Sequence, residues 1–376
     1  MRYNSIVTRH ASSPLTPSGN RRAVGAPASR RVAITARLEY PLPGLPAPGK
    51  LLEVADGVYW LRMPLPFVLD HINLWLLRDG SGWVIVDCGF GNDATKRLWE
   101  QIFSDYLEGR PVNRIVVTHL HPDHIGLAGW LADRFKVDVW MTQAEFISAH
   151  NFWLDADGAY QELQTDLFRR HGLDESKLAE IGSRTDLYRR AVPTLPRTLR
   201  RMIGGDTLTI DGREWRVIIG HGHSPEHASL HCDALELMIA GDMMLPKIST
   251  NVSVSPYEPD GNPLGLFLDS LRRFAELPAD TLVLPSHGHV FYGLYERIEQ
   301  LLHHHEERFA LLIEVCAEPQ TASSVLGQLF KRELDMHQLS FAMGEAIAHL
   351  NYLMYAKRLE RITDSQAVHR FARSAV

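Results

Sequence analysis

The segment that most constrains the fold is a short stretch rich in metal-binding side chains that directly follows an apolar run. The run, residues 115–117, is β-branched throughout and predicts a buried strand. Pro122 prevents both strand pairing and helix continuation, so a loop is expected at the end of this strand. Four candidate ligands fall within the six consecutive positions 119–124: His119, His121, Asp123 and His124. Imidazole and carboxylate groups this closely spaced predict a site for zinc or a similar divalent ion.

Three later segments also place a residue of ligand type directly after an apolar strand. These residues are His223, Asp242 and His287. Open α/β sheets bind their ligands at the carboxyl ends of strands, so these side chains are expected to join the first loop. By position alone His221 competes with His223, and His289 is interpreted as a residue of the surrounding pocket. No role can be assigned to His71.

Composition excludes several classes of protein. A chain of 376 residues exceeds the usual size of one domain, so one large and one small domain are expected. The net charge of −6 argues against nucleic-acid binding through overall basicity, although a local basic groove is still compatible with it. No apolar run approaches the roughly 20 residues needed to cross a bilayer. Three widely separated cysteines imply no disulfide framework and favour a reducing, cytoplasmic location.

Residues 1–38 contain seven arginines and no acidic residue, and they are rich in Ser, Pro, Ala and Gly. Such a segment cannot bury a core and is predicted to be disordered. The composition also suits an organellar transit peptide. A solvated tail or an overlong translation start is the simpler interpretation, because no apolar face at helical spacing is evident. With the proline-rich linker that follows, residues 1–50 are expected to precede the folded part.

Strands alternate with helices across residues 51–292, which predicts an α/β catalytic domain. Within it, residues 144–202 carry apolar and aromatic side chains at helical spacings and predict a helical insertion. Its place just after the ligand-rich loop favours a lid over the site. Trp153 and Tyr160 are expected near enough to contact a substrate.

Residues 293–376 predict a small C-terminal domain of helices followed by a short strand, which is typical of a winged-helix module. The helix predicted over 342–355 is apolar on most of its surface, which favours packing or dimerisation over reading DNA. The run His303–His305 lies on a long helix, where three consecutive side chains point in three directions. They cannot bind one ion together and are expected to be solvated.

Four motifs in order resemble those of the metallo-β-lactamase-fold hydrolase superfamily. They are His119-x-His121-x-Asp123-His124, Gly-His223-Ser-Pro-x-His, Gly-Asp242 and Ser-His287-Gly, and an earlier strand ending in Asp87 also matches. The resemblance covers about residues 51–291. It implies an α/β fold, a four-layer αββα sandwich with the site at one edge of the two sheets. The helical insertion and the winged-helix-like C-terminal domain are added to it.

The resemblance also implies a ligand set for two metal ions. It assigns His119, His121 and His223 to one ion, Asp123, His124 and His287 to the second, and Asp242 to both. Zinc is the expected metal, with iron or manganese as alternatives. Two such ions share a water and lower its pKa towards about 7, which supplies a bridging hydroxide. Asp123 and Asp242 are then the catalytic carboxylates, Asp87 supports the ligand loop, and His227 is structural.

No cysteine belongs to this ligand set, and Asp242 is present, which resembles the glyoxalase II-like and lactonase-like branch. The expected activity is hydrolysis of a small thioester, lactone or similar carboxylic ester. The alternative is a phosphodiesterase or ribonuclease, because winged-helix members of the superfamily include RNA-cutting enzymes and Arg197, Arg200 and Arg201 lie near the end of the insertion. A non-catalytic metal-binding scaffold is disfavoured because no ligand is missing. A homodimer is compatible with the apolar C-terminal helix.

Overall fold

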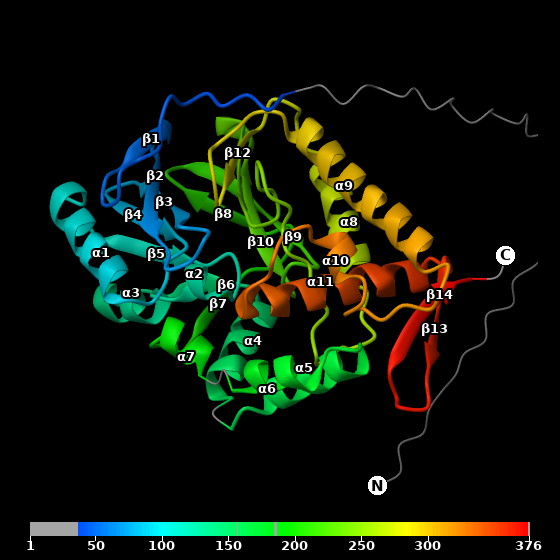
Figure 1. Cartoon of the computed structure of the whole chain (residues 1–376). Coiled ribbons are helices and arrows are strands. Elements are labelled where there is room, and N and C mark those ends of the chain that lie inside the picture. The colour runs from blue at the N-terminus through cyan, green and yellow to red at the C-terminus, as the bar shows by residue number, and fades with distance from the viewer. Residues whose placement is uncertain (1–36, 156, 184–185, 375–376) are drawn as a thin grey trace, which may run out of the picture. The chain divides into compact units, whose positions relative to one another are not determined.

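Two β-sheets lie face to face at the centre of the molecule (Figure 1). The computed structural model describes residues 37–155, 157–183 and 186–374. The seven-stranded sheet has the order β1 (Leu52–Ala55), β2 (Val58–Pro64), β3 (His71–Asp79), β4 (Gly82–Val86), β5 (Val112–Val116), β6 (Val139–Met141) and β7 (Leu199–Arg201). The five-stranded sheet has the order β12 (Leu282–Pro285), β11 (Leu237–Gly241), β10 (His227–Cys232), β9 (Arg213–Gly220) and β8 (Thr207–Ile210).

Each sheet begins with antiparallel strands, and its later strands pair in parallel on the side from which the ligand-bearing segments leave. Strands β1 to β4 pair antiparallel and β4 to β7 pair parallel. In the second sheet β8 to β11 pair antiparallel, and β12 joins β11 in parallel, while the short 3-10 helix η1 (Asp233–Leu235) connects β10 to β11. The parallel strands β5, β11 and β12 each end just before a candidate ligand.

Helices cover the outer faces of both sheets (Figure 1). Helices α1 (Asp93–Tyr106) and α3 (Ala128–Phe135) pack on the seven-stranded sheet, and α8 (Pro263–Phe274) and α9 (Leu294–Val315) on the other. A separate apolar layer, with Trp60 and Trp75 from one sheet and Trp215 and Leu230 from the other, fills the space between the sheets. The expected four-layer αββα sandwich is confirmed.

The predicted insertion is helical over most of its length. It contains α4 (Gln143–Leu154), α5 (Ala159–Arg170), α6 (Glu175–Gly182) and α7 (Leu187–Ala191). Its end returns to the sheet, where β7 pairs in parallel with β6. The four helices therefore form the crossover between two neighbouring parallel strands.

The C-terminal part consists of α10 (Leu326–Leu329), α11 (Met336–Tyr355) and the hairpin β13 (Leu359–Thr363) and β14 (His369–Arg373). Helix α11 begins at a capping box formed by Asp335 and Gln338. Its buried residues Met343 and Ile347 belong to the same apolar cluster as Phe267 of α8. The prediction that this helix packs against the catalytic domain is thus confirmed, while its winged-helix character stays a prediction.

The expectation of a solvated histidine run on α9 is wrong for His305. This side chain is 1 % exposed, and its Nδ1 lies 3.1 Å from Nε2 of His349 on α11. Helix α11 covers the side of α9 to which His305 points, whereas His303 points away and is exposed. Which of three consecutive residues becomes buried depends on the neighbouring helix, and no local pattern records that.

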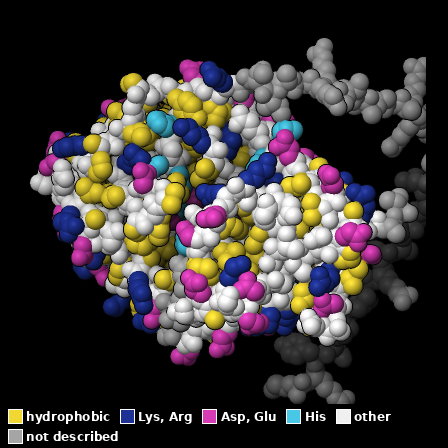
Figure 2. Space-filling model, viewed as in Figure 1, with side chains coloured by type: hydrophobic (Ala, Val, Ile, Leu, Met, Phe, Trp, Pro, Cys, Tyr) yellow, Lys and Arg dark blue, Asp and Glu magenta, His cyan; other side chains and the backbone are white. Residues whose placement is uncertain are grey.

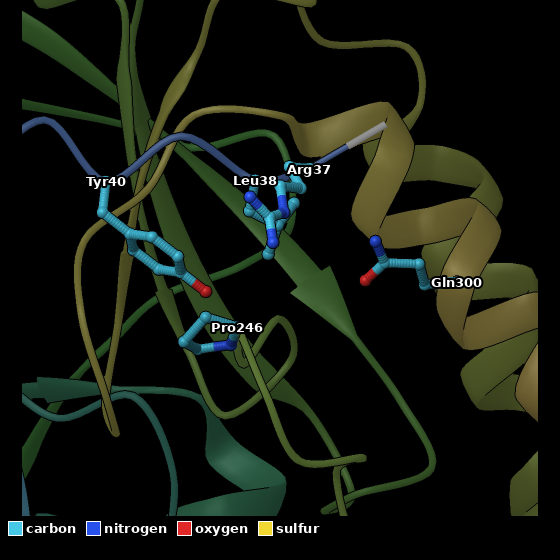
Figure 3. A pocket seen from close by; sticks show the side chains of 5 residues that line it. All are labelled: Arg37, Leu38, Tyr40, Pro246 and Gln300. Atoms are coloured by element: carbon cyan, nitrogen blue, oxygen red, sulfur yellow. The ribbon is translucent and has the colours of Figure 1, made fainter. Parts of the chain in front are cut away.

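Residues 1–36, on which the transit-peptide and tail interpretations rest, lie outside the described residues. The backbone of Glu39 pairs with that of Tyr292, so the described end of the linker packs against the folded part. A cavity of about 420 Å³ lies there, lined by Arg37, Leu38, Tyr40, Pro246 and Gln300 (Figure 3). Across the described residues, every helix is too short or too polar to span a membrane.

Candidate metal centre

The ligand-rich segment follows β5 as predicted, but it is less irregular than expected. A short helix, α2 (Pro122–Ile125), begins directly at Pro122 and places Asp123 and His124 in its single turn. Proline suits the first helical position because the N–H it lacks would have no partner there. The helix turns Asp123 and His124 away from the preceding His121, which stands at its N-terminal cap. The six-residue segment can therefore serve two different ligand groups.

Three imidazoles converge in the first group, which also contains Asp242. Nε2 of His119 lies 2.9 Å from Nδ1 of His121 and 3.2 Å from Nε2 of His223. Oδ2 of Asp242 lies 3.2 Å from Nε2 of His223. These ligand atoms lie within 4.8 Å of one another, as the ligands of one ion do. His221, the positional competitor of His223, instead bonds the carbonyl of Pro225 through Nδ1.

The second group contains Asp123, His124 and His287. Oδ2 of Asp123 lies 3.5 Å from Nε2 of His287 and 3.8 Å from Nε2 of His124. Oδ1 of Asp242 lies 3.5 Å from Nε2 of both histidines. Asp242 therefore directs one carboxylate oxygen to each group. All seven residues that the sequence singled out are brought together at one place.

The donor atoms of the two ligand groups fit a pair of divalent cations. Among the described residues, the buried atoms Nε2 of His124 and Oδ1 of Asp242 have no hydrogen-bond partner. Burial, followed by the neighbouring imidazoles, holds the pKa of His119 well below its usual value, and burial does the same for His121. Neutral imidazoles keep a lone pair for a metal. Burial also opposes a charge on His124, yet the carboxylates of Asp87, Asp123 and Asp242 raise its pKa well above the usual value. That surplus of negative charge favours a cation.

Four of the ligand imidazoles have their outward nitrogen within hydrogen-bond distance of a fixed oxygen. The pairs are His119 with Thr118 Oγ1 (3.0 Å), His124 with Asp87 Oδ2 (2.7 Å), His223 with the Asn251 carbonyl (2.8 Å) and His287 with the His71 carbonyl (2.8 Å). An N–H donated to such an oxygen fixes the tautomer and the ring orientation, so that the inward nitrogen keeps its lone pair for a metal ion.

Asp87 supports the ligand loop through three groups at once. Its carboxylate accepts from the backbone N–H and hydroxyl of Thr118 and contacts Nδ1 of His124. We expect Asp87→Ala to weaken metal binding by about 10–100-fold, the usual effect of losing such a partner, while much of the fold is kept. Chelator competition measures the dissociation constants, and Asp93→Ala, at an exposed position on α1, is the control. Unchanged constants in Asp87→Ala would contradict this role.

Glu145, in the first turn of α4, is a functional residue that the sequence did not reveal. It is fully buried, and its two oxygens accept from Leu120 N (2.9 Å), Ser224 Oγ (2.6 Å) and Glu226 N (2.7 Å). Leu120 lies between two ligands of the first group, and Ser224 follows the third. One carboxylate thus joins the two loops that supply all three imidazoles of that group. Its only sequence signal is an acidic residue in the first turn of a predicted helix.

His71 and His227 also have roles in the structure. The carbonyl of His71 accepts from His287, and its Nε2 accepts from the Gly288 N–H at 2.8 Å. His227 Nε2 accepts from the backbone N–H of Asp242 at 3.1 Å. A side chain at Gly241 would come within 2.3 Å of that imidazole nitrogen, so glycine is required there. His289 packs against the rings of Tyr40 and Trp60 and belongs to neither ligand group.

The insertion contacts the ligand loop through Tyr188, whose hydroxyl donates to the Leu120 carbonyl at 2.7 Å. Trp153 donates to the carbonyl of Val192, and Tyr160 packs on the rings of Phe152 and Tyr257. A substrate contact by Trp153 or Tyr160 stays a prediction.

Hydrophobic side chains gather beside a hollow in which histidine is visible (Figure 2). On the loop between β2 and β3, Phe67 is 45 % exposed. Its ring stacks on His337 of α11 and meets Phe90 edge to face, while His337 in turn meets Phe341. The same loop ends at His71, next to the ligand His287. An aromatic rim of Phe67, Phe90, His337 and Phe341 therefore connects the loop that leads to His71 with the start of α11.

Comparison with known proteins gives consistent matches. The family model of the Metallo-beta-lactamase superfamily matches residues 68–287, and that of a Metallo-beta-lactamase-like C-terminal domain matches residues 309–374. A solved beta-lactamase domain protein from Burkholderia ambifaria is 48% identical with a TM-score of 0.83, covering 90% of this chain and 98% of that one. A probable metallo-hydrolase, YqjP, from Bacillus subtilis is 27% identical over 79% of this chain and 92% of its own length. An atrochrysone carboxyl ACP thioesterase from Aspergillus fumigatus is 21% identical over 77% of this chain and 55% of its own.

Proposed function

The chain belongs to the metallo-beta-lactamase superfamily and is a metallo-hydrolase by that membership, and we propose that it uses two divalent ions, most favourably zinc, to hydrolyse a thioester, lactone or similar carboxylic ester. The observation that carries the proposal is the position of Asp242, whose two oxygens face the two ligand groups separately. A carboxylate shared in this way suits two neighbouring ions better than one.

The residues of the site have separable roles in such a reaction. Two divalent metal ions held by these residues would supply Lewis acidity and would lower the pKa of a bound water. Asp123 is the more exposed of the two acidic ligands, and its carboxylate is available to accept a proton or hydrogen bond from the attacking water. The buried Asp242 fixes the spacing of the two ligand groups. The outward hydrogen bonds of His119, His124, His223 and His287 keep these four imidazoles oriented during turnover.

Two observations favour a carboxylic ester over a phosphodiester. The aromatic rim next to the loop that leads to His71 consists of Phe67, Phe90, His337 and Phe341, which suit an apolar acyl group better than a phosphate backbone. Of Arg197, Arg200 and Arg201, which kept the phosphodiesterase alternative open, Arg200 forms an ion pair with Asp138, which directly precedes β6. The ligand-bearing segment that begins with His119 follows the other, carboxyl end of the parallel strand β5. A relative described as an acyl-carrier-protein thioesterase supports the same choice.

We expect the purified protein to bind close to two equivalents of zinc per chain and His121→Ala to lose metal and activity together. His121 contributes Nδ1 to the first group, so its removal opens that site to water. Elemental analysis after desalting gives the stoichiometry. His303→Ala, at an exposed position on α9, is the matched control and should keep both ions. A single equivalent in the wild-type protein would contradict the dinuclear proposal.

The substrate class is tested by comparing kcat/KM on three groups of model substrates. A medium-chain acyl thioester and a lactone with a medium-length alkyl chain are expected to be hydrolysed. An activated phosphodiester is expected to react far more slowly. Phe67→Ser and Phe341→Ser should raise KM for the longer acyl chains and leave metal content unchanged. Efficient cleavage of the phosphodiester or of RNA, with no turnover of either ester, would establish the alternative instead.

A further inference from the structure

The ligand His223 depends on a segment without regular secondary structure. Its Nδ1 donates to the carbonyl of Asn251, which lies between β11 and α8. The other outward partners, Asp87, Thr118 and His71, belong to β3 or directly follow β4 and β5 in the first sheet. A carbonyl in an irregular segment has no strand ladder to fix it, so its position must be set by what packs against the segment.

Helix α11 supplies that packing. The N–H of Val254 donates to the carbonyl of Gly344 on the helix at 3.2 Å. A side chain at Gly344 would come within 2.6 Å of Ser253 Oγ, so the helix backbone and the segment approach as closely as glycine permits. Ser253 Oγ in turn donates to Oδ1 of Asn251 at 2.8 Å. The backbone of this segment at Val254 and, through Ser253, the side chain of Asn251 are therefore both held next to α11.

Glu345, the residue after Gly344, completes the connection. Burial raises the pKa of its carboxyl, and the guanidinium of Arg308 and a hydrogen bond from the Asn251 side chain act to lower it. The carbonyl oxygen of that side chain is already bonded to Ser253. Oε1 of Glu345 lies 3.5 Å from a guanidinium nitrogen of Arg308 on α9, and Arg308 also donates to His304 at 2.8 Å. The Glu345 side chain is only 12 % exposed. A carboxylate fixed from both sides in this way can hold Asn251 in one conformation.

We propose that Glu345 is a positioning residue of the metal centre, which fixes Asn251 and through it the orientation of His223. The C-terminal α11 thereby helps to determine the geometry of the first ligand group, which Thr118 beside His119 and Glu145 of the insertion also support. The second group is oriented by Asp87 and by the His71 carbonyl, which lie outside the C-terminal part. Loss of Glu345 should therefore weaken the two metal sites unequally.

The test measures two zinc dissociation constants in the full-length protein by competition with a chromophoric chelator. His121→Ala and His287→Ala identify which constant belongs to which ligand group. We expect Glu345→Ala to weaken the first site by about 10-fold or more, the lower end of the range for residues behind a ligand, and to leave the second unchanged. Glu345→Gln keeps an acceptor for Asn251 and should recover most of the affinity. Glu306→Ala, at an exposed position on α9, is the matched control.

A second variant separates positioning from folding. Asn251→Ala keeps the backbone carbonyl that bonds His223 but removes the side chain held by Glu345, and it should show the same selective loss. The double variant should lose no more than either single one, because both changes break one connection. The absorption spectrum of the cobalt-substituted protein should change in the same variants as the zinc affinity. Equal weakening of both sites, additive losses, or an unchanged first site in a folded Asn251→Ala protein would overturn the proposal.

Discussion

Replacing Asp242 with alanine is expected to cost the protein both metal ions and at least about 10²–10³-fold in kcat, the range found when one preorganised electrostatic group is removed from an active site. Its oxygens lie 3.2 Å from His223 and 3.5 Å from His124 and His287, so one change removes a ligand atom from each group. The three imidazoles of the first group would then have no carboxylate among them, and the second group would keep only Asp123. Metal analysis and steady-state kinetics measure the two losses.

Asp242→Asn separates charge from shape. The amide keeps one oxygen and the backbone N–H that donates to His227, so circular dichroism should match the wild-type protein. One ion is expected to remain, with activity between the wild type and Asp242→Ala. A fully active Asp242→Ala protein with two bound ions would refute the shared-carboxylate arrangement.

Glu145→Ala is expected to have the largest effect on stability. The change leaves two backbone N–H groups and the Ser224 hydroxyl without their buried acceptor. Each such loss costs about 1–3 kcal/mol, so a total of roughly 3–9 kcal/mol is expected. Metal binding at the first ligand group should fall as well, because Leu120 and Ser224 are neighbours of its histidines. Thermal unfolding of the apo protein and zinc titration measure the two effects.

Glu145→Gln provides a graded comparison. If its oxygen faces Ser224 and Glu226, its amide nitrogen must face the N–H of Leu120, and two donors oppose each other. An intermediate loss is therefore expected. Glu162→Gln, at an exposed position on α5, changes the same functional group without these partners and should behave as the wild type. Equal melting temperatures for all variants would show that Glu145 is dispensable.

The ligands themselves could be predicted because their signals are local. His119 to His124 occupy six consecutive positions, and Asp242 and His287 directly follow short apolar strands. The carboxyl ends of parallel strands lie along the same edge of a sheet, so the sequence pattern also indicates where these side chains meet. The helix order of the C-terminal part follows from apolar spacing in the same way.

The residues that orient the ligands could not be predicted, because their partners are distant in the sequence. Glu145 bonds groups 25, 79 and 81 positions away, and His71 meets His287 across 216 positions. A backbone carbonyl such as that of Asn251 carries no side-chain signature at all. The burial of His305 likewise depends on α11, whose His349 comes 44 positions later in the chain. Such contacts form only when the layers of the fold pack together, so no short stretch of the sequence predicts them.

The crossover from β6 to β7 has a consequence for how this enzyme can diversify. A connection between two parallel strands can gain or lose residues without shifting the register of the sheet, so most of α4 to α7 is free to change in length and composition. The exceptions are the first turn of α4, which contains Glu145, Tyr188 of α7, which bonds the Leu120 carbonyl, and the buried apolar residues of α5 and α6. Natural variation and directed evolution should therefore accept changes at the exposed positions between Glu145 and Tyr188, where substrate range can be altered, and reject changes at these exceptions.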